Sequence, residues 1–474
     1  WRAPFVAANA ALLVSAPRSQ PPFGVNVIGH INGVFGVAAS SRYLYHGLER
    51  QLPTAAIELL KSATFTYVPH GIPTTRDSGY ALNVVVQNAD MSHDLRESYP
   101  WPEWRIRYNI GYWAYELEKL PSRFLEGALL YDEIWACSEF VAAAIRVTLA
   151  EDPVTRSIPV YAMPVGLPGN DDDVAARKRA SDDKVRWGWR SDEFVFLVAY
   201  DVRSVPERKN PLGAVAAFQR AFAQHDESVR LVIKSHGGSP EQQAPVTSLV
   251  HGWPNIQLID RSLDDDDLQS LKRSIDCYVS LHRSEGYGLN ILEAILASTP
   301  VIATLYSGNM DFMRHLPASY QQNLGVAWKR QTLSRNYGPY PRGNHWSQPD
   351  IADAVRAMAY ASKHRDLIAD QAHRAVDTMR LLFSAHARGK VHARRLRQIQ
   401  AERKESPRTA VPIASPYCYW LRYPDIRRVL GKDPRKLSNH FNKLGSREGR
   451  SDRCDWFSAT IFHAVVRLGS DTYN

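Results

Sequence analysis

Residues 276–304 read DCYVSLHRSEGYGLNILEAILASTPVIAT, and this stretch indicates the class of fold. The apolar run DCYVSLH is followed by a glycine-containing turn, by the helical pattern LNILEAILAS and by a second apolar run, PVIAT. That order is typical of a strand, a turn, a helix and a second, parallel strand. The stretch therefore predicts one unit of a parallel α/β sheet, with Gly286, Tyr287 and Gly288 in the turn.

The same alternation continues on both sides of this stretch. The carboxyl-terminal half adds expected strands at 194–200, 229–235 and 256–260. The amino-terminal half has expected strands at 24–31, 82–88, 107–113 and 132–136. A polar, glycine-containing break at 165–192 separates the two series. We therefore expect an α/β protein of two doubly wound, Rossmann-like domains with a cleft between them, at the carboxyl ends of their strands.

The chain has 474 residues, more than one hydrophobic core usually covers. We expect an amino-terminal arm, two Rossmann-like domains, and a basic helix with a mainly helical carboxyl-terminal appendage. Their bounds are 1–23, 24–185, 186–385 and 386–474.

The composition is that of a folded protein without a membrane span. Hydrophobic residues make up 44% and charged residues 23%, close to the averages for globular proteins. The four cysteines show no CxxC spacing, which argues against a zinc site or a disulfide framework and favours a reducing compartment. Since no uncharged apolar run approaches the ~20 residues of a membrane span, we expect a cytoplasmic protein that is soluble or at most peripheral at the inner membrane face.

A basic run occupies residues 387–408, ARGKVHARRLRQIQAERKESPR. It contains eight lysines and arginines against two glutamates, so its natural partners are phosphates. Two interpretations stay open: a solvated helix face, or contact with anionic lipid or a phosphorylated carrier. No motif of nucleic-acid-binding proteins accompanies the run, and we expect no nucleic-acid partner.

The glycine turn at 286–288 has a specific chemical use. It precedes a helix, whose unpaired amino-terminal amides suit a phosphate. Glu285 comes before the turn, at the end of a strand facing the cleft, and Glu293 lies within the helix, where it can reach hydroxyl groups. A phosphate site between two such carboxylates suits a nucleotide sugar. The alternative is that Glu285 is only a helix-terminal charge and Glu293 a surface residue.

The stretch resembles the retaining glycosyltransferases of the GT-B fold, specifically glycosyltransferase family four. The signature of that family is a glutamate, seven residues and a second glutamate, which are Glu285 and Glu293 here. The resemblance covers about residues 24–400. It implies that 24–185 is the acceptor-side domain, that 186–385 binds the nucleotide sugar, and that Glu285 is catalytic.

A second segment, YDVRSVPERKNPLGAVAAF at 200–218, resembles the basic loop with which the family contacts the diphosphate. On spacing, the two cations are Arg203 and Lys209, with Arg208 as a nearby competitor. Fixed cations at this place stabilise the negative charge that develops on the leaving diphosphate, without a metal.

The remaining candidate residues follow from the resemblance, except Lys234, which is a candidate because it lies at a strand end near the expected cleft. Donor-binding candidates are Gly286, Tyr287, Gly288, Leu289, Glu293, Lys234 and Gly33. Acceptor-side candidates are Tyr112, Trp113 and Glu116. The alternative for this last group is that the aromatics belong to the core and the glutamate caps a helix.

We expect neither a metal nor a cofactor. The acidic run at 264–267 precedes a helix, where such residues favour the helix dipole. His282 lies at a strand end near the expected cleft, and we interpret it as a structural histidine.

The sequence thus predicts a retaining, metal-independent glycosyltransferase of bacterial polysaccharide or glycolipid synthesis. It would move a hexosyl group from a nucleoside-diphosphate sugar, with GDP-mannose preferred on family frequency and UDP- and TDP-sugars next, to a glycan or lipid-linked acceptor. A nucleotide-sugar epimerase of similar shape and a non-catalytic scaffold in polysaccharide assembly are the alternatives.

Overall fold

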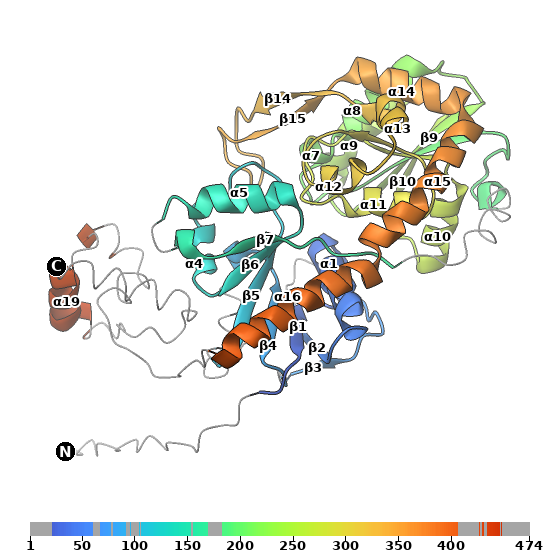
Figure 1. The fold of residues 1–474 in the computed structure, drawn as a ribbon. Coiled ribbons are helices and arrows are strands. Elements are labelled where there is room, and N and C mark those ends of the chain that lie inside the picture. Colours follow the sequence, from blue (N-terminus) through green and yellow to red (C-terminus); the bar gives the residue numbers. More distant parts are fainter. Residues whose placement is uncertain are drawn as a thin grey trace, which may run out of the picture.

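The computed structural model describes residues 21–59, 67–76, 79–91, 95, 104, 106–152, 155–168, 183–405, 426, 429–430, 434–445 and 447. Nearly all of the expected arm at 1–23 and much of the break at 165–192 lie outside these residues. The described chain forms two parallel sheets flanked by helices, as expected (Figure 1).

The first domain is built on a seven-stranded sheet with the order β3-β2-β1-β4-β5-β6-β7. Its strands are β1 (Val25–Gly29), β2 (Thr54–Glu58), β3 (Thr74–Thr75), β4 (Leu82–Val86), β5 (Tyr108–Trp113), β6 (Glu133–Ala136) and β7 (Val160–Ala162). The helices are α1 (Gly36–Glu49), α4 (Phe124–Ala128) and α5 (Glu139–Leu149), with short 3-10 turns at Ala89–Met91 and Thr155–Ser157. Every residue of β1, β4, β5 and β6 is buried, as expected for central parallel strands covered on both faces.

The second domain has a six-stranded sheet with the order β10-β9-β8-β11-β12-β13. Its strands are β8 (Phe194–Asp201), β9 (Val229–His236), β10 (Ile256–Asp260), β11 (Cys277–Ser280), β12 (Val301–Thr304) and β13 (Gly325–Val326). The helices are α7 (Pro206–Lys209), α8 (Pro211–Ala221), α9 (Pro240–Val250), α10 (Asp265–Ser274), α11 (Leu289–Leu296), α12 (Met310–Met313), α13 (Ala318–Leu324) and α14 (Ile351–Lys363). Because β8 lies between β9 and β11, the chain reverses its direction of winding there. The loops that follow β8 and β11 therefore meet at a topological switch point, where α/β proteins bind ligands.

A hairpin not predicted from the sequence extends from the second domain. Its strands are β14 (Trp328–Thr332) and β15 (His345–Pro349), which pair antiparallel. The loop between them reaches the first domain, where Asn344 Nδ2 donates a hydrogen bond of 2.6 Å to Lys119 O. The hairpin thus joins the two domains.

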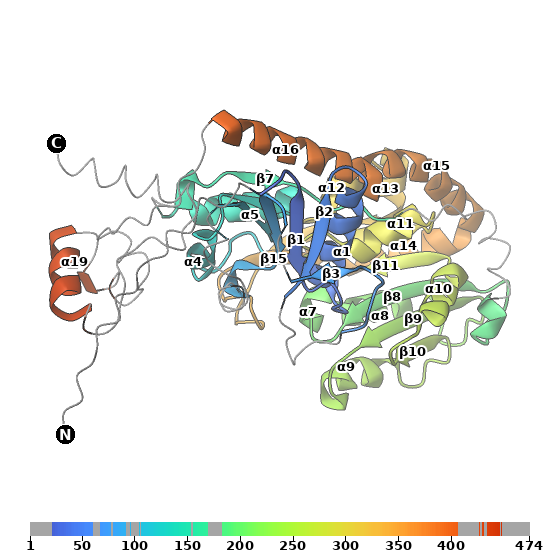
Figure 2. The same cartoon turned by 90° about the horizontal axis from the view of Figure 1, so that it is seen from below.

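The basic run lies in a helix that returns to the first domain. After α15 (Arg365–Phe383), α16 (Ala385–Glu405) packs against α1, with Gly389 so close to Gly47 that a Cβ on Gly389 would lie 2.1 Å from Gly47 O (Figures 1 and 2). The helix begins within one residue of the expected start of the basic helix at 386, and it packs on the first domain. The appendage beyond it is described only in part, as α19 (Pro434–His440) and a π-helical turn at Phe441–Gly445.

Several cations of the basic run hold this helix in place. Arg395 pairs with the fully buried Glu133, and Arg388, Arg397 and Arg403 donate hydrogen bonds to backbone carbonyls of the first domain. Lys390 and Arg394 are exposed. Part of the positive charge predicted for lipid or carrier contact is therefore used within the fold. Among the described residues, no helix combines the length and apolar character that crossing a bilayer requires.

Candidate active site

A buried ion-pair cluster occupies the switch point of the second domain. Glu285 is only 7% exposed, and its Oε1 lies 2.6 Å from Lys209 Nζ. Its Oε2 lies 3.2 Å from Arg208 Nη1. The two cations are consecutive because the short helix α7 turns both of them toward the loop that follows β11. Two of the expected catalytic residues, Glu285 and Lys209, are thus in direct contact.

The arginine of this cluster is Arg208, not Arg203. Arg208 is 2% exposed and donates hydrogen bonds to Ser284 O at 2.8 Å and to Ser204 Oγ at 2.7 Å. Arg203, which the spacing favoured, pairs with Asp201 at 2.8 Å, ahead of α7. Spacing alone could not distinguish the two because the choice depends on where α7 begins.

The electrostatics of the cluster keep Glu285 ionised. Burial alone would raise the pKa of Glu285, but the positive charges of Lys209 and Arg208 outweigh it and lower the pKa to about 2. Glu285 is therefore a carboxylate at neutral pH, held by two cations.

This lowered pKa predicts a dependence of stability on pH. A glutamate in an unfolded chain has a pKa of about 4.3. The Glu285 contribution is therefore fully present above that pH and is lost as the pH falls toward about 2. Between pH 5 and pH 3, we expect the melting temperature of the wild type to fall more steeply than that of Glu285→Gln. Parallel curves for the two proteins would contradict this assignment.

The turn between Glu285 and α11 needs its glycines. Gly288 adopts φ of 90° as the residue that precedes α11, and Leu289 begins the helix. Gly286 packs so closely against Gly308 that a Cβ added to Gly308 would lie 2.0 Å from Gly286 O. Tyr287 is buried and donates to Val165 O of the first domain at 3.0 Å. The turn expected to hold the diphosphate thus lies between the two domains.

The other donor-side candidates lie apart from the cluster. Glu293 accepts a hydrogen bond from Tyr43 of the first domain at 2.8 Å and pairs with Lys272 at 3.1 Å. Lys234 lies near the end of β9, where its Nζ donates to Ser235 O at 2.6 Å. Gly33 lies after β1, in a turn closed by its own N–H to His30 O at 3.0 Å.

The acceptor-side candidates separate into two groups. Tyr112 and Trp113 are 2% and 0% exposed, and Trp113 packs edge-on against Phe124 and Tyr131. Their burial matches the alternative that they are core aromatics, and their positions do not support the expected contact with an acceptor. Glu116 instead lies 3.7 Å from Arg208 and accepts a hydrogen bond from Tyr340 at 2.8 Å. It therefore joins the cluster and is not a helix cap.

Sequence reasoning missed the contacts that the hairpin makes. Tyr340 is buried, and Arg330 of β14 pairs with Glu118 of the first domain. Glu118 also accepts a hydrogen bond from Tyr306 at 3.0 Å. These side chains belong to no local motif, so no signal in the sequence could have found them.

The residues discounted in the sequence have structural roles. The carboxylate of Asp264 caps α10 by accepting a hydrogen bond from Asp267 N at 2.8 Å. His282 is fully buried and contacts Ser280 and Asn309 through its two ring nitrogens. Within the described part of the chain, no group of three or more His, Cys, Asp or Glu side chains is arranged to hold a metal ion.

Comparison with known proteins agrees with this geometry. The family model described as glycosyl transferases group 1 matches residues 181–319. A search of curated protein sequences found no match.

Similar solved structures include HepE from Anabaena in complex with UDP and glucose, with a TM-score of 0.53 at 12% identity, covering 79% of this chain and 99% of that one. A sucrose-phosphate synthase from Thermosynechococcus elongatus has a TM-score of 0.52 at 13% identity, covering 80% and 99%. A glycosyltransferase from Rickettsia africae has a TM-score of 0.56 at 13% identity, covering 80% and 99%. The fold of this chain is therefore GT-B, and the family match within its second domain supports a glycosyltransferase.

Proposed function

We propose that this chain is a retaining glycosyltransferase that moves a hexosyl group from a nucleoside-diphosphate sugar to a glycan or lipid-linked acceptor. The observation that carries the proposal is the contact of Lys209 and Arg208 with Glu285, directly before the glycine turn of α11. This arrangement gathers two fixed cations, a carboxylate and a helix amino terminus at one place.

Each part has a role in the transfer. When the bond from the anomeric carbon to the diphosphate breaks, Lys209, Arg208 and the amides that begin α11 stabilise the negative charge on the leaving group. Glu285 then faces the positive charge that develops on the sugar. Glu293 is assigned to the ribose hydroxyls. Without a donor, the single negative charge of Glu285 is shared between Lys209 and Arg208, so the two cations keep positive charge for a diphosphate.

Retention of the anomeric configuration rests on the resemblance to family four. In a front-face reaction, the acceptor oxygen bonds to the anomeric carbon as the diphosphate leaves, and a phosphate oxygen takes the acceptor proton. No separate general base is then required. A covalent intermediate is the other route to retention.

The donor is tested with several nucleotides. Family frequency favours GDP-mannose, whereas HepE forms a complex with UDP and glucose, so UDP-sugars belong in the same screen. Melting temperatures are measured with GDP, UDP and TDP, since a ligand that binds only the folded state raises the apparent stability. We expect one of the three nucleotides to raise the melting temperature clearly. An unchanged melting temperature with all three would favour the hypothesis of a non-catalytic scaffold.

The nucleotide sugar that binds is then incubated with the protein alone and with an acceptor. With a transferase, the amount of glycosylated product increases with the amount of acceptor added. An epimerase releases free sugar without one. This comparison separates the two enzymatic hypotheses.

We expect the transfer reaction to be independent of divalent metal, because the diphosphate charge is met by side-chain cations and helix amides. Adding EDTA in excess should leave the initial rate unchanged within error. The check is the rate with EDTA, with EDTA and excess Mg²⁺, and with EDTA and excess Mn²⁺. A loss of rate that either metal restores would contradict the assignment.

A further inference from the structure

A cavity that is open to solvent lies beside the cluster, lined by residues that the proposed function does not use. Its volume is about 340 Å³, within the ~300–1,000 Å³ typical of small-molecule sites. Its walls come from the 202–207 segment, from Gln242 and from the 335–338 segment of the hairpin loop. Glu285, Lys209 and Glu293 are not among the residues that line it.

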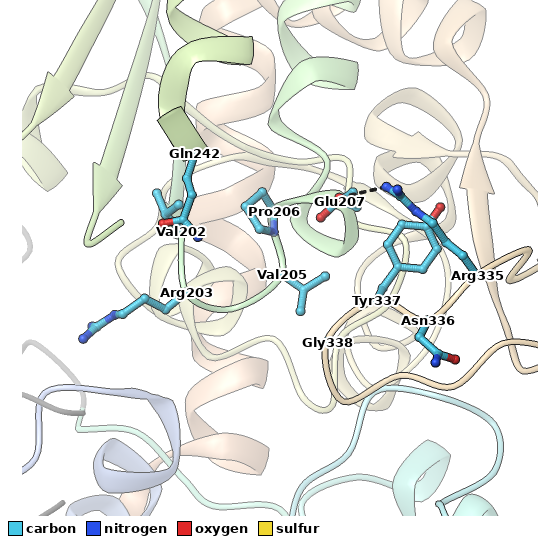
Figure 3. Close-up of a pocket in the computed structure, with 10 residues that line it drawn as sticks. All are labelled: Val202, Arg203, Val205, Pro206, Glu207, Gln242, Arg335, Asn336, Tyr337 and Gly338. Carbon is cyan, nitrogen blue, oxygen red and sulfur yellow. Dashed lines mark ion pairs between the residues drawn. The ribbon is translucent and has the colours of Figure 1, made fainter. Parts of the chain in front are cut away.

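The walls offer hydrogen-bond donors from two sides. Figure 3 shows Arg203 and Gln242 on one side, Arg335 and Asn336 on the other, and Val205 between them; the guanidinium of Arg203 points away from the other labelled side chains and pairs with Asp201. The amide oxygens of Gln242 and Asn336 already accept backbone hydrogen bonds, at 2.9 Å from Ser239 N and at 2.8 Å from Arg342 N. Among the described residues, neither amide NH₂ has an acceptor, so both can serve a ligand.

The positive charge of Arg335 is also available to pair with a ligand. Arg335 is 69% exposed and is held by a single ion pair, at 3.5 Å from Glu207, together with the ring of Tyr337. An exposed pair of this kind contributes little to stability, so an oxyanion can replace Glu207 at low cost. The planar guanidinium suits the two oxygens of a carboxylate or phosphate.

The backbone at the cavity is strained. Val205 adopts φ of 55° and ψ of 89°, which is unusual for a β-branched residue. It lies close to the opposite wall, since a Cβ added to Gly338 would lie 3.2 Å from Val205 Cγ2. Strain of this type concentrates at ligand-binding segments.

Both walls connect directly to the candidate active site. The 202–207 segment leads into Arg208 and Lys209 within α7. The hairpin loop also carries Tyr340, which donates to Glu116 at 2.8 Å in the first domain. A ligand in the cavity would therefore lie between the catalytic loop and the hairpin that joins the two domains.

We propose that this cavity is an acceptor subsite that binds an oxyanion of the acceptor, a carboxylate or a phosphate on a sugar next to the one that is glycosylated. The role of the bound sugar as an acceptor rests on the proposed function. Binding of the oxyanion to the cavity can be tested without measuring the transfer reaction. Arg335 is its main contact, with the amides of Gln242 and Asn336 in support.

The test measures binding of glucose, glucuronate and glucose 6-phosphate by calorimetry to the full chain, to Arg335→Ala and to Arg342→Ala. Arg342 is an exposed arginine of the same loop that does not line the cavity. One or both of the anionic sugars should bind the wild type about tenfold more tightly than glucose, the effect of one charge-assisted hydrogen bond. Arg335→Ala should lose this preference and Arg342→Ala should keep it. The anionic sugar that binds identifies the group as carboxylate or phosphate.

Two results would overturn the proposal: equal binding of all three sugars to the wild type, or a preference that survives in Arg335→Ala. The same titrations on Lys209→Ala exclude binding at the diphosphate site, because a true subsite keeps its preference there. The nucleotide melting shifts of Arg335→Ala report separately on the donor site. If no nucleotide raises the melting temperature of the wild type while the anionic sugar still binds, the proposed function is wrong, and the cavity stands as an anion-binding site without an acceptor role.

Discussion

Glu285→Gln is expected to lower kcat by on the order of a hundredfold to a thousandfold, with a donor KM within a few-fold of the wild type. In the proposed reaction the carboxylate faces the sugar, and its attraction to the anomeric centre grows as positive charge develops there. Glutamine has nearly the same size but no charge, so the loss falls mainly on the transition state. Initial rates with the donor varied at saturating acceptor give both constants.

Glu293→Gln is the matched control for this prediction. Its contacts, with Tyr43 and Lys272, lie away from the cluster. If it binds ribose in the ground and transition states alike, its replacement should raise the donor KM and leave kcat close to that of the wild type. A kcat for Glu285→Gln near the wild-type value would show that the carboxylate has no part in the chemistry.

Stability must be followed in the same variant. Removing one partner from a buried ion pair commonly costs about 3–5 kcal/mol, because the remaining charges are left without compensation. Circular dichroism and the melting temperature show whether Glu285→Gln is folded at the assay temperature. Glu285→Asp keeps the charge, so a recovery of melting temperature without recovery of kcat would assign the loss to the position of the carboxylate.

Lys209→Ala is expected to lower kcat by on the order of a hundredfold, the usual effect of removing one preorganised charge contact. The protein should still fold, because Arg208 continues to pair with Glu285 at 3.2 Å. Single-turnover rates at saturating donor separate this loss from weaker donor binding.

Arg220→Ala is a suitable control for Lys209→Ala. Arg220 is an exposed residue of α8, the helix that follows the same loop, and its removal takes away the same unit of charge. We expect it to keep the wild-type rate. If Lys209→Ala also retains activity within about threefold, the lysine is not a contact of the leaving diphosphate.

The sequence predicted the parts of the site that depend on local pattern. The strand, turn and helix at 276–304 placed Glu285 in the loop after β11 and Gly288 before α11, since hydrophobic period and glycine conformation are local properties. The doubly wound order of both sheets followed from the same alternation.

The remaining contacts depend on distant parts of the chain. Glu116 and Tyr340 are 224 residues apart, and nothing near either of them indicates the other. Tyr112 and Trp113 lie at the end of a strand and are both buried, Trp113 against Phe124 of α4, which a strand pattern cannot reveal. Arg208, and not Arg203, pairs with Glu285, because the four-residue helix α7 sets the direction of each side chain.

The packing of α16 on α1 has a consequence for the order of synthesis. Residues Gly36–Glu49 leave the ribosome before the second domain, whereas Ala385–Glu405, which cover them, follow that domain. Domains usually fold in turn as the chain emerges, at about 5–20 residues per second. The surface of the first domain around Gly47 and Glu133 is therefore uncovered until α16 itself has been made.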